Sequence, residues 1–211
     1  MDRSPCWRPN RRTILVGAAL LPLSAKARET VLTPGQTEGP FYPVTFPSEV
    51  DNDLVRIAGH AARAMGQVVH VSGRVIDLQG RPQRGAVVEI WQCDANGIYR
   101  HPRAPGQARF DGGFQGYGRV AVDAVGAYRF RTIRPVPYPG RTPHIHFAVA
   151  VPGLGRLVTQ MYVAGEPLNA RDAVLAGIRD PAARESVIVA LAPADAVEPG
   201  ALGGTFDIVV G

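Results

Sequence analysis

Two histidines and two tyrosines are the side chains of this chain best suited to bind a metal ion. His144 and His146 follow Tyr138 closely in the run YPGRTPHIHF, and Tyr99 ends the upstream run DANGIY. Side chains alternate between the two faces of a strand, so His144 and His146 would lie on one face. Neutral imidazole binds many first-row ions, whereas a phenol, with a pKa of about 10, becomes a ligand only when a highly charged cation displaces its proton. The set therefore favours ferric iron.

Each of these residues also has a more ordinary interpretation. A His-x-His pair in an apolar strand is more often two polar contacts than a metal site, and tyrosines beside Gly or Pro are commonly turn or edge aromatics. A zinc hydrolase would use the same pair, but it normally adds a carboxylate, a cysteine or a third histidine. His60, His70 and His101 lack such spacing. We expect His101 to be an exposed loop residue, with a supporting role beside Tyr99 as the alternative.

The sequence around these residues bears on the choice. Four further segments keep a consistent order and spacing over about residues 33–167: TPGQTEGPFYP at 33–43, GAVVEIWQCDANGIY at 85–99, YRFRTIRP at 128–135 and TQMY at 159–162. Together with the YPGRTPHIHF run, they resemble the intradiol ring-cleavage dioxygenases, the family that includes protocatechuate 3,4-dioxygenase and catechol 1,2-dioxygenase.

The resemblance implies a ligand set and a reaction. It places a non-haem ferric ion, Fe(3+), on Tyr99, Tyr138, His144 and His146. It implies that dioxygen cleaves a catechol-type ring between its two hydroxyl-bearing carbons to give a cis,cis-muconate-type diacid. Tyr138 would leave the metal and accept a substrate proton, while Tyr99 stays bound.

Two more positions match polar residues of the family's active site. Its arginine falls on Arg141 and its glutamine on Gln160, and both would be hydrogen-bond donors held in place before the reaction. We expect Arg141 at the edge of the cavity, in an electrostatic role rather than as an ordinary surface charge.

One departure and one alternative follow from the same comparison. Only Pro139 and Gly140 separate Tyr138 from Arg141, where protocatechuate dioxygenase has a longer loop, so the sequence does not identify the catechol.

The alternative function is a non-catalytic transthyretin-like binding module with a vestigial metal site. The complete set of four ligands, with the arginine and the glutamine, disfavours it.

Strand signals dominate the rest of the chain and predict an all-β sandwich of transthyretin-like (prealbumin-like) architecture, with long active-site loops and little helix. The 24 Gly and 19 Pro suit many short strands joined by turns. The first two predicted strands, 69–77 and 86–92, are expected to form a hairpin-like pair. Helix is indicated only around 54–65 and 170–179, and the arm at 33–47 has no regular pattern. By the resemblance, this arm packs near the active site. The predicted strands are 69–77, 86–92, 119–122, 127–131, 144–151, 157–163, 187–191 and 205–210.

The N-terminus has the features of a twin-arginine signal peptide over residues 1–27. Arg11 and Arg12 precede an apolar run at 14–23 and a small-x-small cleavage site that ends at Ala27. The run is shorter than the roughly 20 residues that span a bilayer, so we expect no stable membrane anchor after cleavage. After cleavage, we expect the mature protein to be a single catalytic domain, 28–211, in the periplasm or outside the cell.

Removal of this leader changes both the charge and the cysteine content. Residues 1–27 carry five basic side chains and Asp2, a net charge of +4, which leaves +1 of the formal +5 and no basic footprint for nucleic acid. Cys6 is lost with the leader, so no internal disulfide can form. The remaining Cys93 is expected to be a small buried residue rather than a reactive nucleophile. The expected partners are a catechol and dioxygen, and the sequence leaves open whether the protein is a homo-oligomer.

Overall fold

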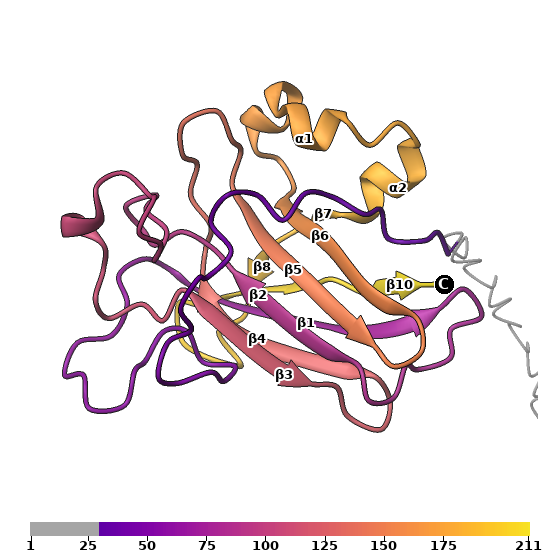
Figure 1. Cartoon of the computed structure of the whole chain (residues 1–211), viewed down its shortest axis with the longest axis horizontal. Coiled ribbons are helices and arrows are strands. Elements are labelled where there is room, and N and C mark those ends of the chain that lie inside the picture. Colours follow the sequence, from indigo (N-terminus) through magenta and orange to yellow (C-terminus); the bar gives the residue numbers. More distant parts are fainter. Residues whose placement is uncertain (1–29) are drawn as a thin grey trace, which may run out of the picture.

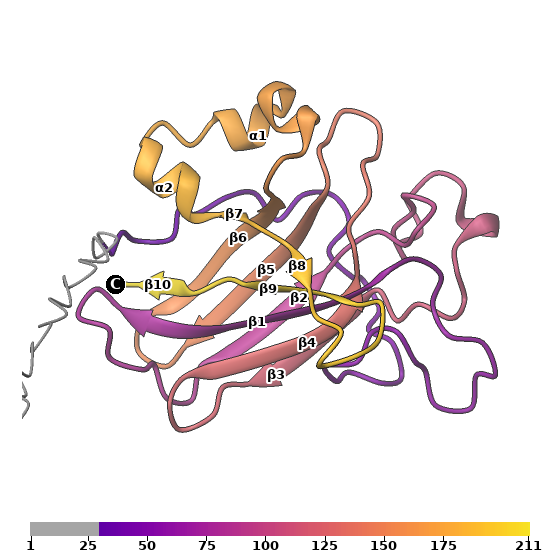
Figure 2. The same ribbon diagram turned by 180° about the vertical axis from the view of Figure 1, so that it is seen from behind.

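The computed structural model describes residues 30–211, and the predicted leader lies outside this part of the chain. Two sheets pack face to face (Figures 1 and 2), as the predicted β-sandwich requires. In one sheet, β1 (Val68–Asp77) pairs with β4 (Ala127–Ile133), β9 (Leu202–Thr205) and β10 (Ile208–Val210), and β8 (Ala192–Pro193) adds to β9. The second sheet has the order β3 (Tyr117–Ala121), β2 (Val87–Trp91), β5 (His144–Val151), β6 (Gly155–Val163) and β7 (Ile188–Val189).

The core lies between the sheets and is formed by alternate residues of the strands. Ile145, Phe147 and Val149 of β5 are fully buried in one cluster with Val71 of β1 and Phe130 of β4. Burial of this apolar surface fixes which face of β5 points inward, because a shift of one residue would turn every side chain to the other face. The histidines of β5 must therefore point away from the core.

The predicted hairpin of the first two strands is wrong. β1 pairs antiparallel with β4 and parallel with β9 and β10, whereas β2 pairs antiparallel with β3 and β5 in the other sheet. The turn after Asp77 reverses the chain, but β2 then crosses to the opposite layer. Each strand finds its partners in distant segments that bury its apolar face, and a local turn signal does not determine that choice.

Helix is scarcer than predicted. The segment 54–65 forms turns, because the backbone of Leu54 bonds to Arg131 and Gln115 of neighbouring segments instead of to its own next turn. The predicted helix at 170–179 is reduced to a 3-10 turn (Pro167–Arg171) and α1 (Ala173–Ala176). A helix that was not predicted, α2 (Pro181–Ser186), begins at the side-chain cap of Asp180. A second 3-10 turn spans Gln107–Arg109. No helix in the described residues is long and apolar enough to cross a membrane.

Two of the predicted strands also change. The segment 205–210 is interrupted at Phe206 and Asp207 and contributes to both β9 and β10. The segment 187–191 keeps only Ile188–Val189 as β7. The Phe206 backbone bonds to Ser72 and Tyr128 at the interruption.

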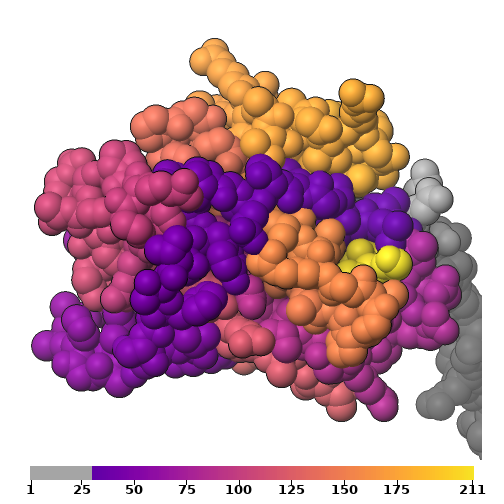
Figure 3. All heavy atoms as spheres, viewed as in Figure 1, coloured from indigo at the N-terminus to yellow at the C-terminus, as the bar shows by residue number. Residues whose placement is uncertain are grey.

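Three irregular segments gather outside β5. They are the loop after β2, the loop between β4 and β5, and the N-terminal arm (Figure 1). The arm, indigo in Figure 3, runs across this face between the loop after β2 and the helical segment. Backbone bonds from Gln36 to Val158 and from Thr33 to Val209 hold it against both sheets. It therefore covers the face of β5 that carries the histidines.

Candidate active site

The four predicted ligands converge at one point. The Nε2 atoms of His144 and His146 are 3.2 Å apart, and the hydroxyl oxygens of Tyr99 and Tyr138 each lie 3.5 Å from Nε2 of His144. Both histidines come from β5, and the two tyrosines come from the two loops above it. The sequence prediction that these residues lie together is therefore matched by the geometry.

A tight turn presents Tyr138 and Arg141 to this point. The N–H of Arg141 donates to the carbonyl of Tyr138 at 2.9 Å, with Pro139 and Gly140 between them and φ of +82° at the glycine. Proline second and a positive-φ glycine third are the features of a type II turn. The short loop is thus a defined structure that fixes the spacing of the phenol and the guanidinium.

Burial keeps both imidazoles neutral. Nδ1–H of His144 donates to the carbonyl of Thr142 at 2.6 Å, which leaves the lone pair of Nε2 facing the other donors. Burial, and then the charge of Arg141, lowers the pKa of His144 to about 4. The pKa of His146 lies well below its ordinary value, through burial and then its neighbours His144 and Arg141. Neutral imidazole is the form that binds a metal.

Burial has the opposite effect on the phenols. It raises the pKa of Tyr99 well above the ordinary value, and it raises that of Tyr138 although Arg141 opposes the shift. Desolvation disfavours the charged form of each group. A phenolate at this point therefore requires a compensating cation beside it.

The donor set fits one resident metal ion. Ligands held about 2.1 Å from a common ion lie roughly 3.0–3.6 Å from one another, and Nε2 of His144 lies 3.2 Å from Nε2 of His146 and 3.5 Å from each phenol oxygen. Nδ1 of His146 is buried without a partner among the described groups. Within residues 30–211, no group of three or more His, Cys, Asp or Glu side chains is arranged so that it could hold a metal ion. The set is therefore two nitrogens and two phenol oxygens, and the carboxylate or thiolate expected of a zinc hydrolase is not part of it.

Arg141 is held on three sides. Its Nε donates to Asp172 at 2.8 Å, its Nη2 to Oε1 of Gln160 at 2.5 Å and its Nη1 to the hydroxyl of Tyr138 at 3.4 Å. Gln160 also accepts from Tyr162, and its Nε2 donates to the carbonyl of Thr37 in the arm. Gln160 thus fixes Arg141 with its oxygen and holds the arm with its amide.

Three other neighbours of the site had little or no signal in the sequence. Phe41 of the arm stacks on the ring of Tyr99 at 4.9 Å. Gln36 donates to the hydroxyl of Tyr162 and accepts from the backbone N–H of Gln160. Asp172 precedes the apolar turn of α1, and an Asp in that position is a helix-cap signal, but nothing local indicates that it contacts Arg141.

The expectations for His101 and Cys93 have opposite outcomes. His101 is buried, not exposed, with 1% of its surface accessible, because Phe41 covers it and its Nδ1 accepts from the N–H of Arg103. Cys93 is buried as expected, and burial followed by the charge of Asp94 raises the pKa of its thiol to about 12. A thiol of that pKa is a poor nucleophile.

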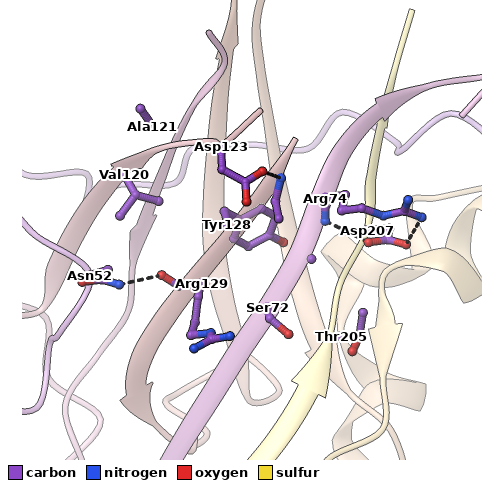
Figure 4. A pocket seen from close by; sticks show the side chains of 12 residues that line it. Asn52, Ser72, Arg74, Val120, Ala121, Asp123, Tyr128, Arg129, Thr205 and Asp207 are labelled. Carbon is purple, nitrogen blue, oxygen red and sulfur yellow. Dashed lines mark hydrogen bonds and ion pairs between the residues drawn. The ribbon is translucent and has the colours of Figure 1, made fainter. Parts of the chain in front are cut away.

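A small cavity opens beside Tyr138, one of the four donors. It has a volume of about 150 Å³, and its lining includes Tyr138, Arg141, Leu168, Arg171 and Asp172. A cavity of about 150 Å³ is large enough for one benzene ring. A larger hollow of about 640 Å³ lies on the β1 and β4 side of the sandwich (Figure 4), but none of the four donors lines it.

Comparisons with known proteins agree with this geometry. Residues 37–211 match the family model described as Dioxygenase. The protocatechuate 3,4-dioxygenase beta chain of Burkholderia cepacia is 38% identical over 199 residues, which cover 90% of this chain and 81% of that protein. The chain belongs to the intradiol ring-cleavage dioxygenase family. As an intradiol dioxygenase it is a ring-cleaving oxidoreductase, and the non-catalytic binding module considered from the sequence is not supported.

Other intradiol dioxygenases match over different shares of their length. Hydroxyquinol 1,2-dioxygenase of Corynebacterium glutamicum is 35% identical over 67% of this chain, and the chain spans about half (50%) of that relative. A solved structure, the dioxygenase domain of a dioxygenase and carbohydrate-binding protein fusion from Streptomyces sp. SirexAA-E, matches with a TM-score of 0.66 and 32% identity, over 85% of this chain and 98% of that domain. The sandwich fold is thus shared with this dioxygenase domain.

Proposed function

We propose that the protein holds one non-haem ferric ion on Tyr99, Tyr138, His144 and His146 and uses dioxygen to cleave a monocyclic catechol between its hydroxyl-bearing carbons. The product is a cis,cis-muconate-type diacid. Both oxygen atoms of dioxygen enter this product, so the reaction needs no external reductant. The convergence of two neutral imidazoles and two phenols within 3.5 Å is the observation that carries the proposal.

The two tyrosines differ in their access to substrate. Tyr99 is 3% exposed beneath Phe41, whereas the half-buried Tyr138 lines the cavity. Tyr138 is therefore the phenol that an entering catechol meets, and its oxygen is the proposed acceptor of one catechol proton. Tyr99 is the permanent ligand in this proposal, because its ring is packed in place.

When bound, the ferric ion supplies the Lewis acidity that favours loss of the catechol protons and the attack of dioxygen on the ring. The chain supplies orientation and charge. Arg141 lines the same cavity, with Nη1 near the Tyr138 hydroxyl, so it stabilises negative charge that develops on the substrate. Gln160 keeps the guanidinium there. The arm excludes water, because Phe41 and Gly39 lie against Tyr99 and His146.

Metal analysis and turnover of the purified protein test this proposal. We expect about one iron per chain, a red to brown colour from phenolate-to-iron charge transfer, and uptake of dioxygen with catechol. His146→Ala should lose most of the iron, while His60→Ala, at an exposed position, should keep it. A colourless active protein that contains zinc would refute the iron assignment. An iron-loaded protein that is inactive on every catechol would refute the reaction.

We also propose that the protein is exported folded by the twin-arginine route and acts in the periplasm or outside the cell. The paired arginines, the short apolar run and the cleavage site at Ala27 support this location. Export in the folded state suits a protein that acquires its metal in the cytoplasm. Mass spectrometry of the exported form should find a terminus after Ala27.

A further inference from the structure

The carboxylate of Asp172 is the most buried charged group beside the site. Its side chain is 0% exposed, and each of its oxygens has two donors. Oδ1 accepts from the backbone N–H groups of Val174 and Leu175 at the start of α1. Oδ2 accepts from Nε of Arg141 at 2.8 Å and from the N–H of Thr142 at 3.0 Å. One carboxylate thus joins the helical segment to the loop that carries the active-site arginine.

The two oxygens serve separate purposes. A helix cap needs only one side-chain oxygen, and Oδ1 supplies it to α1. Oδ2 faces the site, and no other carboxylate of the described residues pairs with Arg141. Burial by itself raises the pKa of Asp172, but the hydrogen bonds from Leu175, Thr142 and Arg141 outweigh it and hold that pKa below the ordinary value. The carboxylate is therefore a charged anchor.

The same contact reaches a predicted metal ligand. Thr142 donates its N–H to Asp172 and accepts, at its carbonyl, from Nδ1 of His144. The hydroxyl of Thr142 is fixed separately by Asn169 at 2.7 Å. Asp172 thus contacts Arg141 directly, whereas it is connected to His144 only through a residue with other supports. Loss of Oδ2 should therefore displace the guanidinium more than the imidazole.

We propose that Asp172 is a positioning residue of the dioxygenase, which fixes the Arg141 guanidinium between Gln160 and the Tyr138 hydroxyl in the orientation that turnover requires. This inference rests on the proposed function. Without Asp172, Gln160 would hold Nη2 and only the long 3.4 Å contact with the Tyr138 hydroxyl would remain on Nη1, so the Nε edge of the planar group would have no partner. With Asp172 on Nε at 2.8 Å, that edge is fixed as well.

Asp172→Ser separates capping from positioning. Serine caps helices about as well as aspartate but is too short and uncharged to hold Arg141. The matched control is Asp180→Ser at the cap of α2, where the carboxylate accepts from Ala183 and contacts no residue of the site. We expect Asp172→Ser to keep its iron and its affinity for catechol in an anaerobic visible titration, while kcat falls about 10–100-fold, the scale for groups that orient a metal site. Asp180→Ser should have the kcat of the unmodified protein.

A double-mutant cycle shows whether Asp172 acts through Arg141. If it does, Asp172→Ser should slow the Arg141→Ala variant no further. An unchanged kcat in Asp172→Ser, or an equal loss of kcat in both backgrounds, would overturn the inference. Asp172→Asn repeats the test with a side chain of the same shape. If both variants unfold while Asp180→Ser folds, Asp172 is structural and the inference also fails. An unmodified protein that binds iron but is inactive would instead refute the proposed function.

Discussion

Arg141→Ala is the substitution whose effects on turnover and stability can both be worked out from the contacts. The guanidinium lines the cavity and is fixed by Asp172 and Gln160, so the site holds this charge in place before substrate arrives. Loss of one preorganised electrostatic donor lowers kcat by about 10²–10³, or roughly 2.7–4 kcal/mol of transition-state stabilisation. Binding of catechol should change little, because Arg141 is not among the four converging donors.

The stability of the variant follows from what the substitution leaves behind. Asp172 would lose one donor but keep three backbone N–H groups. The loss should therefore be about 1–3 kcal/mol, the scale for one unsatisfied buried group, and less than the roughly 3–5 kcal/mol for a buried charge left without any partner. At about 2–4 °C per kcal/mol for a domain of this size, Tm should fall by roughly 2–12 °C.

Three measurements test this reasoning on one preparation: dioxygen uptake, anaerobic visible titration with catechol, and thermal unfolding. The matched control is Arg179→Ala, at an exposed position outside the cavity. Turnover of Arg141→Ala at the rate of the unmodified protein would refute the electrostatic role. A loss of catechol affinity as large as the loss of kcat would show that Arg141 acts in binding instead.

Three further predictions concern the second tyrosine, acid stability and export. Tyr138→Phe should keep its iron and the part of the visible band that comes from Tyr99. Anaerobic binding of catechol, followed by stopped-flow spectra, should be slower by orders of magnitude. Unimpaired binding would exclude Tyr138 as the proton acceptor. Hydrogen bonds from Arg131 depress the pKa of Glu198 to about 2 from an ordinary 4.5, so its contribution to stability is present above about pH 4.5 and is lost as pH falls toward 2. In denaturant unfolding of the metal-free protein, the unfolding free energies of the unmodified protein and of Glu198→Gln should therefore differ less at pH 3 than at pH 6. An equal difference at both pH values would refute this. Replacement of the Arg11-Arg12 pair by lysine should retain the protein in the cytoplasm, and normal export of that variant would contradict the twin-arginine assignment.

Local sequence determined the fold class and the strand that carries His144 and His146. The alternation from His144 to Val149 is enough to predict a strand with an apolar face and a histidine face, and β5 has those bounds and those faces. A proline and a glycine between Tyr138 and Arg141 are enough for the turn. These predictions hold because side-chain alternation and backbone steric limits act between neighbours in the chain.

Tertiary structure alone decided which distant segments meet. The sequence indicates a turn after β1 but not that β2 crosses to the other sheet, since pairing depends on which apolar faces can be buried together. It indicates a cap at Asp172 but not the contact with Arg141, and it gives no sign that Phe41 covers His101. Burial of a polar group is a property of everything packed around it. The four candidate ligands, Arg141 and Gln160 could thus be proposed from the chain and its family resemblance. The contacts of Asp172 with Arg141 and of Phe41 with Tyr99 follow only from the packing of the arm, the loops and the helix on the sandwich.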